Sequence, residues 1–222
     1  MATIFTDGFE SGDLSNWSGS TLAEASTDVA FTGTYSGKLH TSGGAYMIKT
    51  DVMAIAGRRT SFRYRSTNPV YWVASIAHVG GTSIFGLFCN GSSVLQLFNG
   101  DNLATQIGSD GPTLSANTWY RIAISFVVTS TTVYEVRVYV NGTLAISGTD
   151  GPTLIATNHN SLMVGNSAGG SGNSYVDDVY IDDGTDLADP LAADAVGHSG
   201  VAASVGVYSP RGTTQPTARG WA

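Results

Sequence analysis

Apolar and polar side chains alternate along much of the chain, and this is the period of an extended strand rather than of a helix. In residues 134–140 the apolar side chains of Tyr134 and three valines would face one way and the intervening side chains the other. The dipeptide Asn141-Gly142 follows, and it favours a two-residue hairpin turn because both residues adopt positive φ readily. Residues 143–147 would form the returning strand, so the pattern predicts a β-hairpin.

Further strands are predicted by the same period-two pattern, over residues 59–65, 70–79, 83–89, 93–98 and 119–127. Short strands separated by turn residues are typical of a sandwich or barrel. No convincing amphipathic helix is present, and Leu22–Ala30 is the segment with room for a turn or two of helix. We therefore predict an all-β, antiparallel two-sheet sandwich of jelly-roll type. Its expected core residues are Phe9, Trp17, Phe62, Tyr64, Ile122, Ile124, Val136, Val138 and Val179.

The composition changes near Asp183 in this chain of 222 residues. We predict a sandwich domain over residues 1–186 and an extended C-terminal arm over 187–222. The arm is rich in Ala, Gly, Ser, Thr and Pro, so it cannot bury enough apolar area to hold itself together and would gain order from neighbouring chains. Arg and Trp are enriched at interface hot spots, and the candidate anchors of the arm are therefore Arg211, Arg219 and Trp221. The alternative for these three residues is a loosely held terminus.

The charge balance excludes several classes of partner. Ten basic residues are scattered through a chain of net charge −7, which makes a poor binder of phosphate backbones, so no nucleic-acid partner is expected. No apolar run approaches the roughly 18 residues that a bilayer span needs, so no membrane partner is expected either. The N-terminus shows no basic and apolar signal segment, and Cys89 has no second cysteine to pair with. These features suit a protein made and folded in a reducing cytoplasm.

Catalysis has little support in the sequence. The four histidines stand in no metal-ligand spacing, and neither a Gly-x-Ser-x-Gly elbow nor a phosphate-binding loop is present. Glycoside hydrolysis needs two carboxylates that flank the scissile bond, but Glu135 has no carboxylate near it on its strand. Cys89 lies in an apolar run and is expected to be a buried small side chain. The chain is predicted not to be an enzyme, to have no catalytic residues and to require no cofactor.

Four aspartates gather in residues 174–184, at positions 177, 178, 182 and 183. On a regular strand, Asp178 would share a face with Val176, Tyr180 and Asp182. A buried carboxylate needs a partner, because an unpaired buried charge is costly. Calcium, hydrogen bonds from backbone amides, and solvent exposure at a strand end are the three alternatives.

Two pairs of adjacent aromatic residues are candidates for binding sugars, since a pyranose has an apolar face that stacks on a ring. They are Tyr71-Trp72 and Trp119-Tyr120. Neighbours on a strand point to opposite faces, so one ring of each pair can be exposed. Trp72 and Trp119 are the candidate glycan-binding residues, and packing in the core is the alternative.

Four segments carry a resemblance to a known family. Residues 8–17 (GFESGDLSNW), the central segments 117–122 (NTWYRI) and 138–142 (VYVNG), and residues 175–181 (YVDDVYI) resemble segments of concanavalin A-like and laminin-G-like jelly-roll domains. The resemblance covers roughly residues 5–183. It implies a concanavalin A-like jelly roll in which a glutamate of the first motif and an aspartate of the last meet at a structural calcium ion. By this resemblance Glu10 and Asp178 would be the metal ligands.

A second resemblance concerns the setting. Laminin-G-like domains that begin without a signal peptide, and continue past an Ile-Asp-Asp-Gly strand end into a short tail, resemble virion proteins of tailed bacteriophages. This implies a non-enzymatic structural protein of the virion, most directly a capsid decoration (cement) protein that stabilises the shell through lattice contacts. Its partners would be other virion subunits, in a homo-oligomer for which a trimer is favoured. The alternative is a carbohydrate-binding module or tail adhesin that recognises a host surface glycan.

Overall fold

Fourteen β-strands make up the regular structure of the described residues in the computed structural model. The structure describes residues 2–41, 44–52, 57–78, 83–100, 103, 105–130, 133–150, 159–165, 172–184 and 186–189. Within these ranges, no helix is long and apolar enough to cross a membrane.

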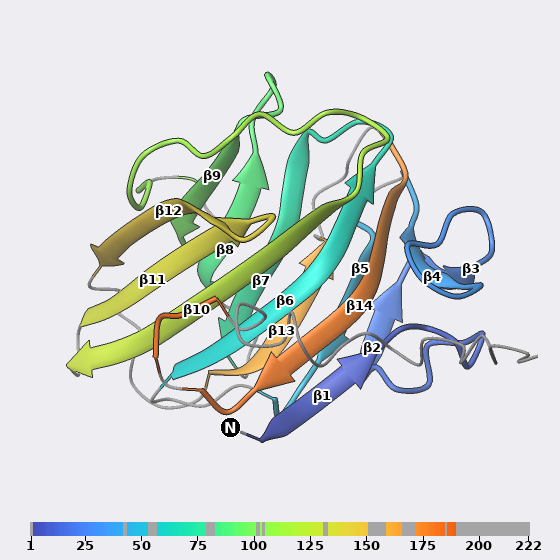
Figure 1. The fold of residues 1–222 in the computed structure, drawn as a ribbon, viewed down its shortest axis with the longest axis horizontal. Coiled ribbons are helices and arrows are strands. Elements are labelled where there is room, and N and C mark those ends of the chain that lie inside the picture. The colour runs from blue at the N-terminus through green and yellow to red at the C-terminus, as the bar shows by residue number, and fades with distance from the viewer. Residues whose placement is uncertain are drawn as a thin grey trace, which may run out of the picture.

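The strands form two antiparallel sheets that pack face to face (Figure 1). The eight-stranded sheet has the order β12-β11-β10-β6-β14-β4-β3, with β1 also paired to β14. Its strands are β1 (Thr3–Asp7), β3 (Ala23–Ser26), β4 (Ser36–Leu39), β6 (Gly57–Ser66), β10 (Tyr120–Ser130), β11 (Val133–Val140), β12 (Thr143–Asp150) and β14 (Ser174–Asp182). The six-stranded sheet, in the order β2-β5-β13-β7-β8-β9, contains β2 (Gly19–Thr21), β5 (Tyr46–Lys49), β7 (Tyr71–His78), β8 (Ser83–Cys89), β9 (Leu95–Asn99) and β13 (His159–Gly165). The predicted all-β, two-sheet jelly-roll sandwich is confirmed.

The predicted hairpin is the β11–β12 pair. Val140 lies opposite Thr143, and the two turn residues Asn141 and Gly142 have φ values of 52° and 85°. Buried and partly exposed residues alternate along the whole of β11. The local pattern was sufficient here, because turn and alternation belong to one continuous segment.

The short helix considered for Leu22–Ala30 is wrong. Residues 23–26 form β3, which pairs with β4 from Ala23 opposite Leu39 to Ser26 opposite Ser36. Leu22 has a φ of 48°, a value outside the right-handed helical region. Pairing with a strand that lies farther along the chain overrides the weak local helical preference.

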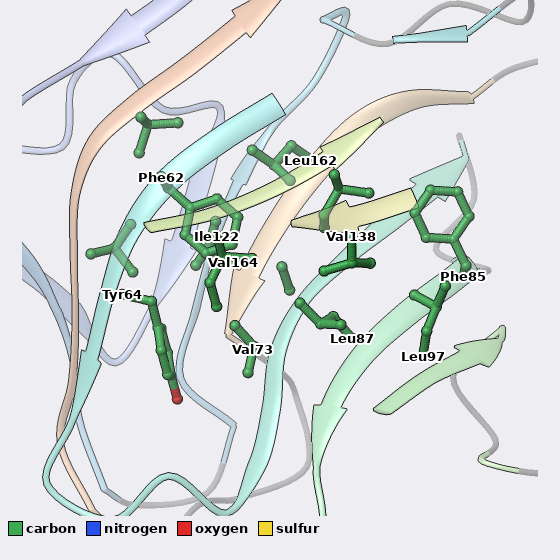
Figure 2. Packing of buried hydrophobic residues seen from close by; sticks show 14 of the residues in the cluster. Phe62, Tyr64, Val73, Phe85, Leu87, Leu97, Ile122, Val138, Leu162 and Val164 are labelled. Carbon is green, nitrogen blue, oxygen red and sulfur yellow. The ribbon is translucent and has the colours of Figure 1, made fainter. Parts of the chain in front are cut away.

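The core lies between the two sheets. Figure 2 shows Phe62, Ile122 and Val138 of the eight-stranded sheet packed towards Val73, Leu87 and Leu162 of the six-stranded sheet. Burial of each large apolar side chain contributes about 1.5–3 kcal/mol. All the predicted core residues are buried in this cluster: Phe9, Trp17, Phe62, Tyr64, Ile122, Ile124, Val136, Val138 and Val179.

A β-bulge interrupts β14 in its middle. Asp177 lies opposite Arg63 and Tyr180 lies opposite Ser61, so three steps along β14 match two steps along β6. Asp178 occupies the bulge with a φ of 47°. The prediction that Asp178 shares a face with Val176 is therefore wrong, because the extra residue shifts the alternation. At the bulge β14 also changes its partner on the other side, from β4 to β1.

Residues 186–189, which follow β14, lie against the outer face of the eight-stranded sheet (Figure 1). The Ser125 hydroxyl donates to the carbonyl of Ala188 at 2.6 Å, and the Tyr139 hydroxyl donates to the carbonyl of Leu187 at 2.7 Å. Residues 187–189, the first of the predicted arm, therefore contact the sandwich. The rest of the arm, with Arg211, Arg219 and Trp221, lies outside the described residues.

Candidate functional site

Residues 31–35 form a loop beside the bulge in β14, and buried Asp177 holds one end of it. Asp177 Oδ2 accepts hydrogen bonds from the backbone amides of Phe31 (2.8 Å) and Thr32 (3.1 Å), and its Oδ1 accepts one from the amide of Asp178 (2.8 Å). The residue is completely buried. Burial raises the pKa of Asp177 to about 6, although the three amide donors act in the opposite direction.

Glu10 and Asp178 hold the same loop. The Thr32 hydroxyl donates to Asp178 Oδ1 at 2.7 Å, while the amides of Thr34 and Tyr35 donate to Glu10 Oε1 at 2.9 and 3.0 Å. Gly33 has a φ of +64°, and a Cβ at this position would overlap the Glu10 carboxylate. The structure thus brings both predicted calcium ligands to one loop.

The oxygen atoms of Glu10 and Asp178 suit calcium as ligands. Calcium takes six to eight oxygen ligands, and carboxylates and carbonyls are its preferred donors. Glu10 and Asp178 offer carboxylate oxygens and are the residues that would hold the ion. In the parts of the chain that the structure describes, no group of three or more His, Cys, Asp or Glu side chains could hold a metal, so the other ligands would be hydroxyl or peptide oxygens. Structural calcium stays a prediction.

An exposed aromatic pair, the aromatic platform, consists of Phe31 from this loop and Trp119 from the segment before β10. Their ring centroids are 5.9 Å apart and their planes are inclined by 69°. Phe31 is 41% exposed and Trp119 is partly exposed, so the platform lies on the surface. Packing in the core, the alternative considered for Trp119, is therefore wrong.

Arg65 of β6 holds the turn that leads to Trp119. Its guanidinium donates to the carbonyl and the side-chain oxygen of Asn117 at 3.1 and 3.0 Å. Asn117 has a φ of 60°, and its amide donates to the carbonyl of Ser66 at 2.7 Å. Both rings of the platform are thus carried by backbone segments with fixed hydrogen bonds.

Arg63 lies beside the platform, with its guanidinium carbon 4.0 Å from the centroid of the Phe31 ring. It is partly exposed, and it makes no hydrogen bond or ion pair with any residue that the structure describes. Burial lowers the pKa of Arg63, an effect that the carboxylates of Asp178 and Asp177 oppose. The N–H donors of Arg63 therefore remain available to a ligand.

Two other outward-facing arginines of this sheet, Arg59 and Arg121, are paired with aspartates. Arg59 makes a bidentate pair with Asp182 at 2.9 and 2.6 Å, and it also contacts Asp186 at 2.9 Å. Arg121 pairs with Asp189 through both ends of its guanidinium, one bond being 2.7 Å long.

The two predicted glycan-binding tryptophans belong to different sheets. Trp72 lies on β7 opposite Phe88 of β8, in the six-stranded sheet, whereas Trp119 directly precedes β10 of the eight-stranded sheet. They do not form one site, and the structure describes only the backbone of Trp72. Sequence reasoning did not find Phe31 or Arg63. The available signal for Phe31 was an aromatic residue among the turn-forming residues of its segment, FTGTYSG.

The structure also describes Cys89 and Glu135, the two residues considered individually for catalysis. Cys89 is fully buried, and burial raises the pKa of its thiol to about 12. The Glu135 carboxylate accepts a 3.0 Å hydrogen bond from Arg137 on the same strand.

Residues 60–185, more than half of the chain, match the family model of the concanavalin A-like lectin/glucanases superfamily. The chain belongs to this superfamily. The family resemblance of the sequence motifs is thereby confirmed. Among curated proteins, none matches the chain significantly.

Solved structures with the same fold include proteins that act on or bind carbohydrates. The endo-β-1,4-glucuronan lyase of Trichoderma reesei has a TM-score of 0.62 and 13% identity, over 85% of this chain and 99% of the lyase. The carbohydrate esterase vb_24B_21 of the Shiga toxin-encoding bacteriophage phi24B has a TM-score of 0.57 and 15% identity, over 81% and 97%. Domain 4 of AbnA, an extracellular arabinanase of Geobacillus stearothermophilus solved with arabinotriose, has a TM-score of 0.56 and 17% identity, over 81% and 91%. At these identities the likeness shows the fold alone.

Proposed function

We propose that this chain is a carbohydrate-binding domain and that it binds sugar on the aromatic platform of Phe31 and Trp119. The observation that carries the proposal is the exposure of both rings on hydrogen-bonded loops next to a polar side chain with free donors. Ligand sites typically combine aromatic surfaces with a few convergent polar groups. The apolar face of a pyranose would stack on Trp119, and its hydroxyls would meet Arg63.

Binding without catalysis is part of the proposal. The carboxylates nearest the platform are occupied in structural roles, since Asp177 and Glu10 accept hydrogen bonds from backbone amides. Hydrolysis of a glycoside needs an acid and a base or nucleophile on opposite sides of the bond. The superfamily contains both enzymes and binding domains, and this arrangement favours a binding domain.

The glycan-binding role replaces the cement role as the leading function. The hypothesis of a capsid decoration protein relied in part on the arm over residues 187–222, most of which lies outside the described residues. Structural neighbours with carbohydrate ligands or substrates support the glycan-binding alternative instead. A virion location and a homo-oligomer with other virion subunits remain predictions, and a tail adhesin would combine them with glycan binding.

Binding to a glycan array, followed by titration calorimetry of the hits, tests the proposal. We expect Trp119→Ala and Phe31→Ala to weaken binding at least tenfold, equivalent to about 1.4 kcal/mol. Leu144→Ala is the matched control, because Leu144 is 48% exposed on β12 of the same sheet and lies outside the platform. Absence of glycan binding, or equal affinities for Trp119→Ala and the control, would overturn the proposal.

A further inference from the structure

We infer that the sugar bound by this domain is acidic and that Arg63 binds its carboxylate. The inference rests on the proposed glycan-binding function and names its ligand class. Its basis is the position of the guanidinium, 4.0 Å from the centroid of the Phe31 ring and without a hydrogen-bonding partner among the described residues.

Arg63 differs from the other arginines of β6. Arg58 donates to the carbonyls of Val52 and Gly57, and Arg59 and Arg65 bind the aspartates and the asparagine described above. A guanidinium has five N–H donors, and a partly buried one without partners has lost hydration that nothing in the protein replaces. A ligand that accepts hydrogen bonds from these donors would replace the lost hydration and so offset its free-energy cost.

The neighbouring carboxylates do not bind the Arg63 donors. Both carboxylate oxygens of Asp177 accept hydrogen bonds from backbone amides, and Asp178 Oδ1 accepts a hydrogen bond from the Thr32 hydroxyl. These two carboxylates raise the pKa of Arg63 electrostatically, although neither forms an ion pair with it. On the other side, Arg121 is already neutralised by Asp189 and does not compete strongly for an added anion.

A carboxylate is the hydrogen-bond acceptor that best matches the geometry of the Arg63 guanidinium. Guanidinium and carboxylate form paired, parallel hydrogen bonds, which are stronger than bonds to neutral hydroxyls. Stacking on Phe31 orients the guanidinium through a cation–π contact, and Phe31 in turn contacts Trp119. A chain of uronic acid residues offers both required features, an apolar ring face and a carboxylate on each residue.

The test compares acidic polysaccharides with their uncharged forms. Polygalacturonate, polyglucuronate and polymannuronate would each be titrated beside the fully methyl-esterified polymer, which keeps the backbone and removes the charge. We expect at least one polyuronate to bind tenfold or more tightly than its ester. Arg63→Gln should remove this preference, and Arg63→Lys should retain part of it because the charge remains without the planar fork.

Arg137→Gln is the matched control, because Arg137 is a partly exposed arginine of β11 in the same sheet. Unchanged melting temperatures would show that each variant is folded. Glycan binding that needs Trp119 but is equal for acid and ester, or an acid preference that survives Arg63→Gln, would overturn the inference and leave the proposed function standing. Failure to bind any glycan, charged or neutral, would overturn both.

Discussion

Asp177 on β14 accepts a hydrogen bond from the backbone amide of Phe31, which lies 146 positions earlier in the chain. A buried carboxylate in the last strand therefore holds the loop that carries an exposed ring of the platform. The contact lies next to the bulge at Asp178, where the partner of β14 changes from β4 to β1.

Asp177→Asn should destabilise the protein and weaken the platform. An amide nitrogen in place of one carboxylate oxygen would face backbone N–H donors, and the expected loss in the free energy of unfolding is about 1–3 kcal/mol. Urea denaturation measures this loss, and Asp183→Asn, at an exposed position after the same strand, is the control. Equal stability of the two variants would contradict the structural role of Asp177.

The stability difference between wild type and Asp177→Asn should depend on pH. The pKa of Asp177 is about 6 in the folded chain against an ordinary value of 3.8, so between these values the folded state binds more protons than the unfolded state. Stability from this group is then fully present below pH 3.8 and is lost as the pH rises through 6. Urea denaturation at pH 4, 5, 6 and 7 should show the wild type losing stability relative to the variant, and a constant difference would contradict this.

Breaking the Arg59–Asp182 pair should cost more than breaking a surface pair. The two side chains are only 4% and 1% exposed, so removing one leaves the other charge buried without its main partner. We expect Arg59→Met or Asp182→Asn to cost about 3–5 kcal/mol, with the double replacement costing less than the sum. Arg137→Met, which breaks an exposed pair with Glu135, should cost about 1 kcal/mol or less. Additive losses in a double-mutant cycle would show that the pair is not coupled.

Two truncations should separate the C-terminal segment that packs on the sheet from the rest of the arm. A chain ending at Asp189 keeps the Arg121–Asp189 pair and should melt close to the full-length chain. A chain ending at Asp183 leaves Arg121 mostly buried without its partner, and it should lose about 3–5 kcal/mol. Asp189→Asn in the full-length chain should reproduce most of this loss. If the shorter chain melted like the longer one, residues 186–189 would not belong to the stable domain.

Calcium should raise the melting temperature through Glu10 and Asp178. At about 100 times its dissociation constant, an ion bound only to the folded state adds about 2.7 kcal/mol, which is about 5–10 °C for a domain of this size. Glu10→Gln should abolish the rise and Glu24→Gln, at an exposed position on β3, should preserve it. Identical melting in calcium and in a chelator would contradict the prediction.

The local sequence was enough to predict the strand-rich fold and much of its core. Alternation in β11, the Asn141-Gly142 turn and the burial of residues such as Phe62 follow from the period of a strand and from backbone conformations available to single residues. Trp119 could be named as a candidate exposed aromatic, but the alternation of neighbouring side chains did not decide between Trp119 and Tyr120. All these features depend on neighbours within a few positions.

Tertiary structure decided what surrounds Trp119. Phe31, Arg63 and Asp177 come from three segments that meet only when β14 pairs with β6 and the loop after β3 closes over the bulge. The bulge itself, one extra residue opposite β6, reverses the alternation and has no marker in the local pattern. Alternation along one strand says which residues share a face, but which strands lie beside it, and therefore which arginine remains without a partner, depends on contacts between residues far apart in the chain.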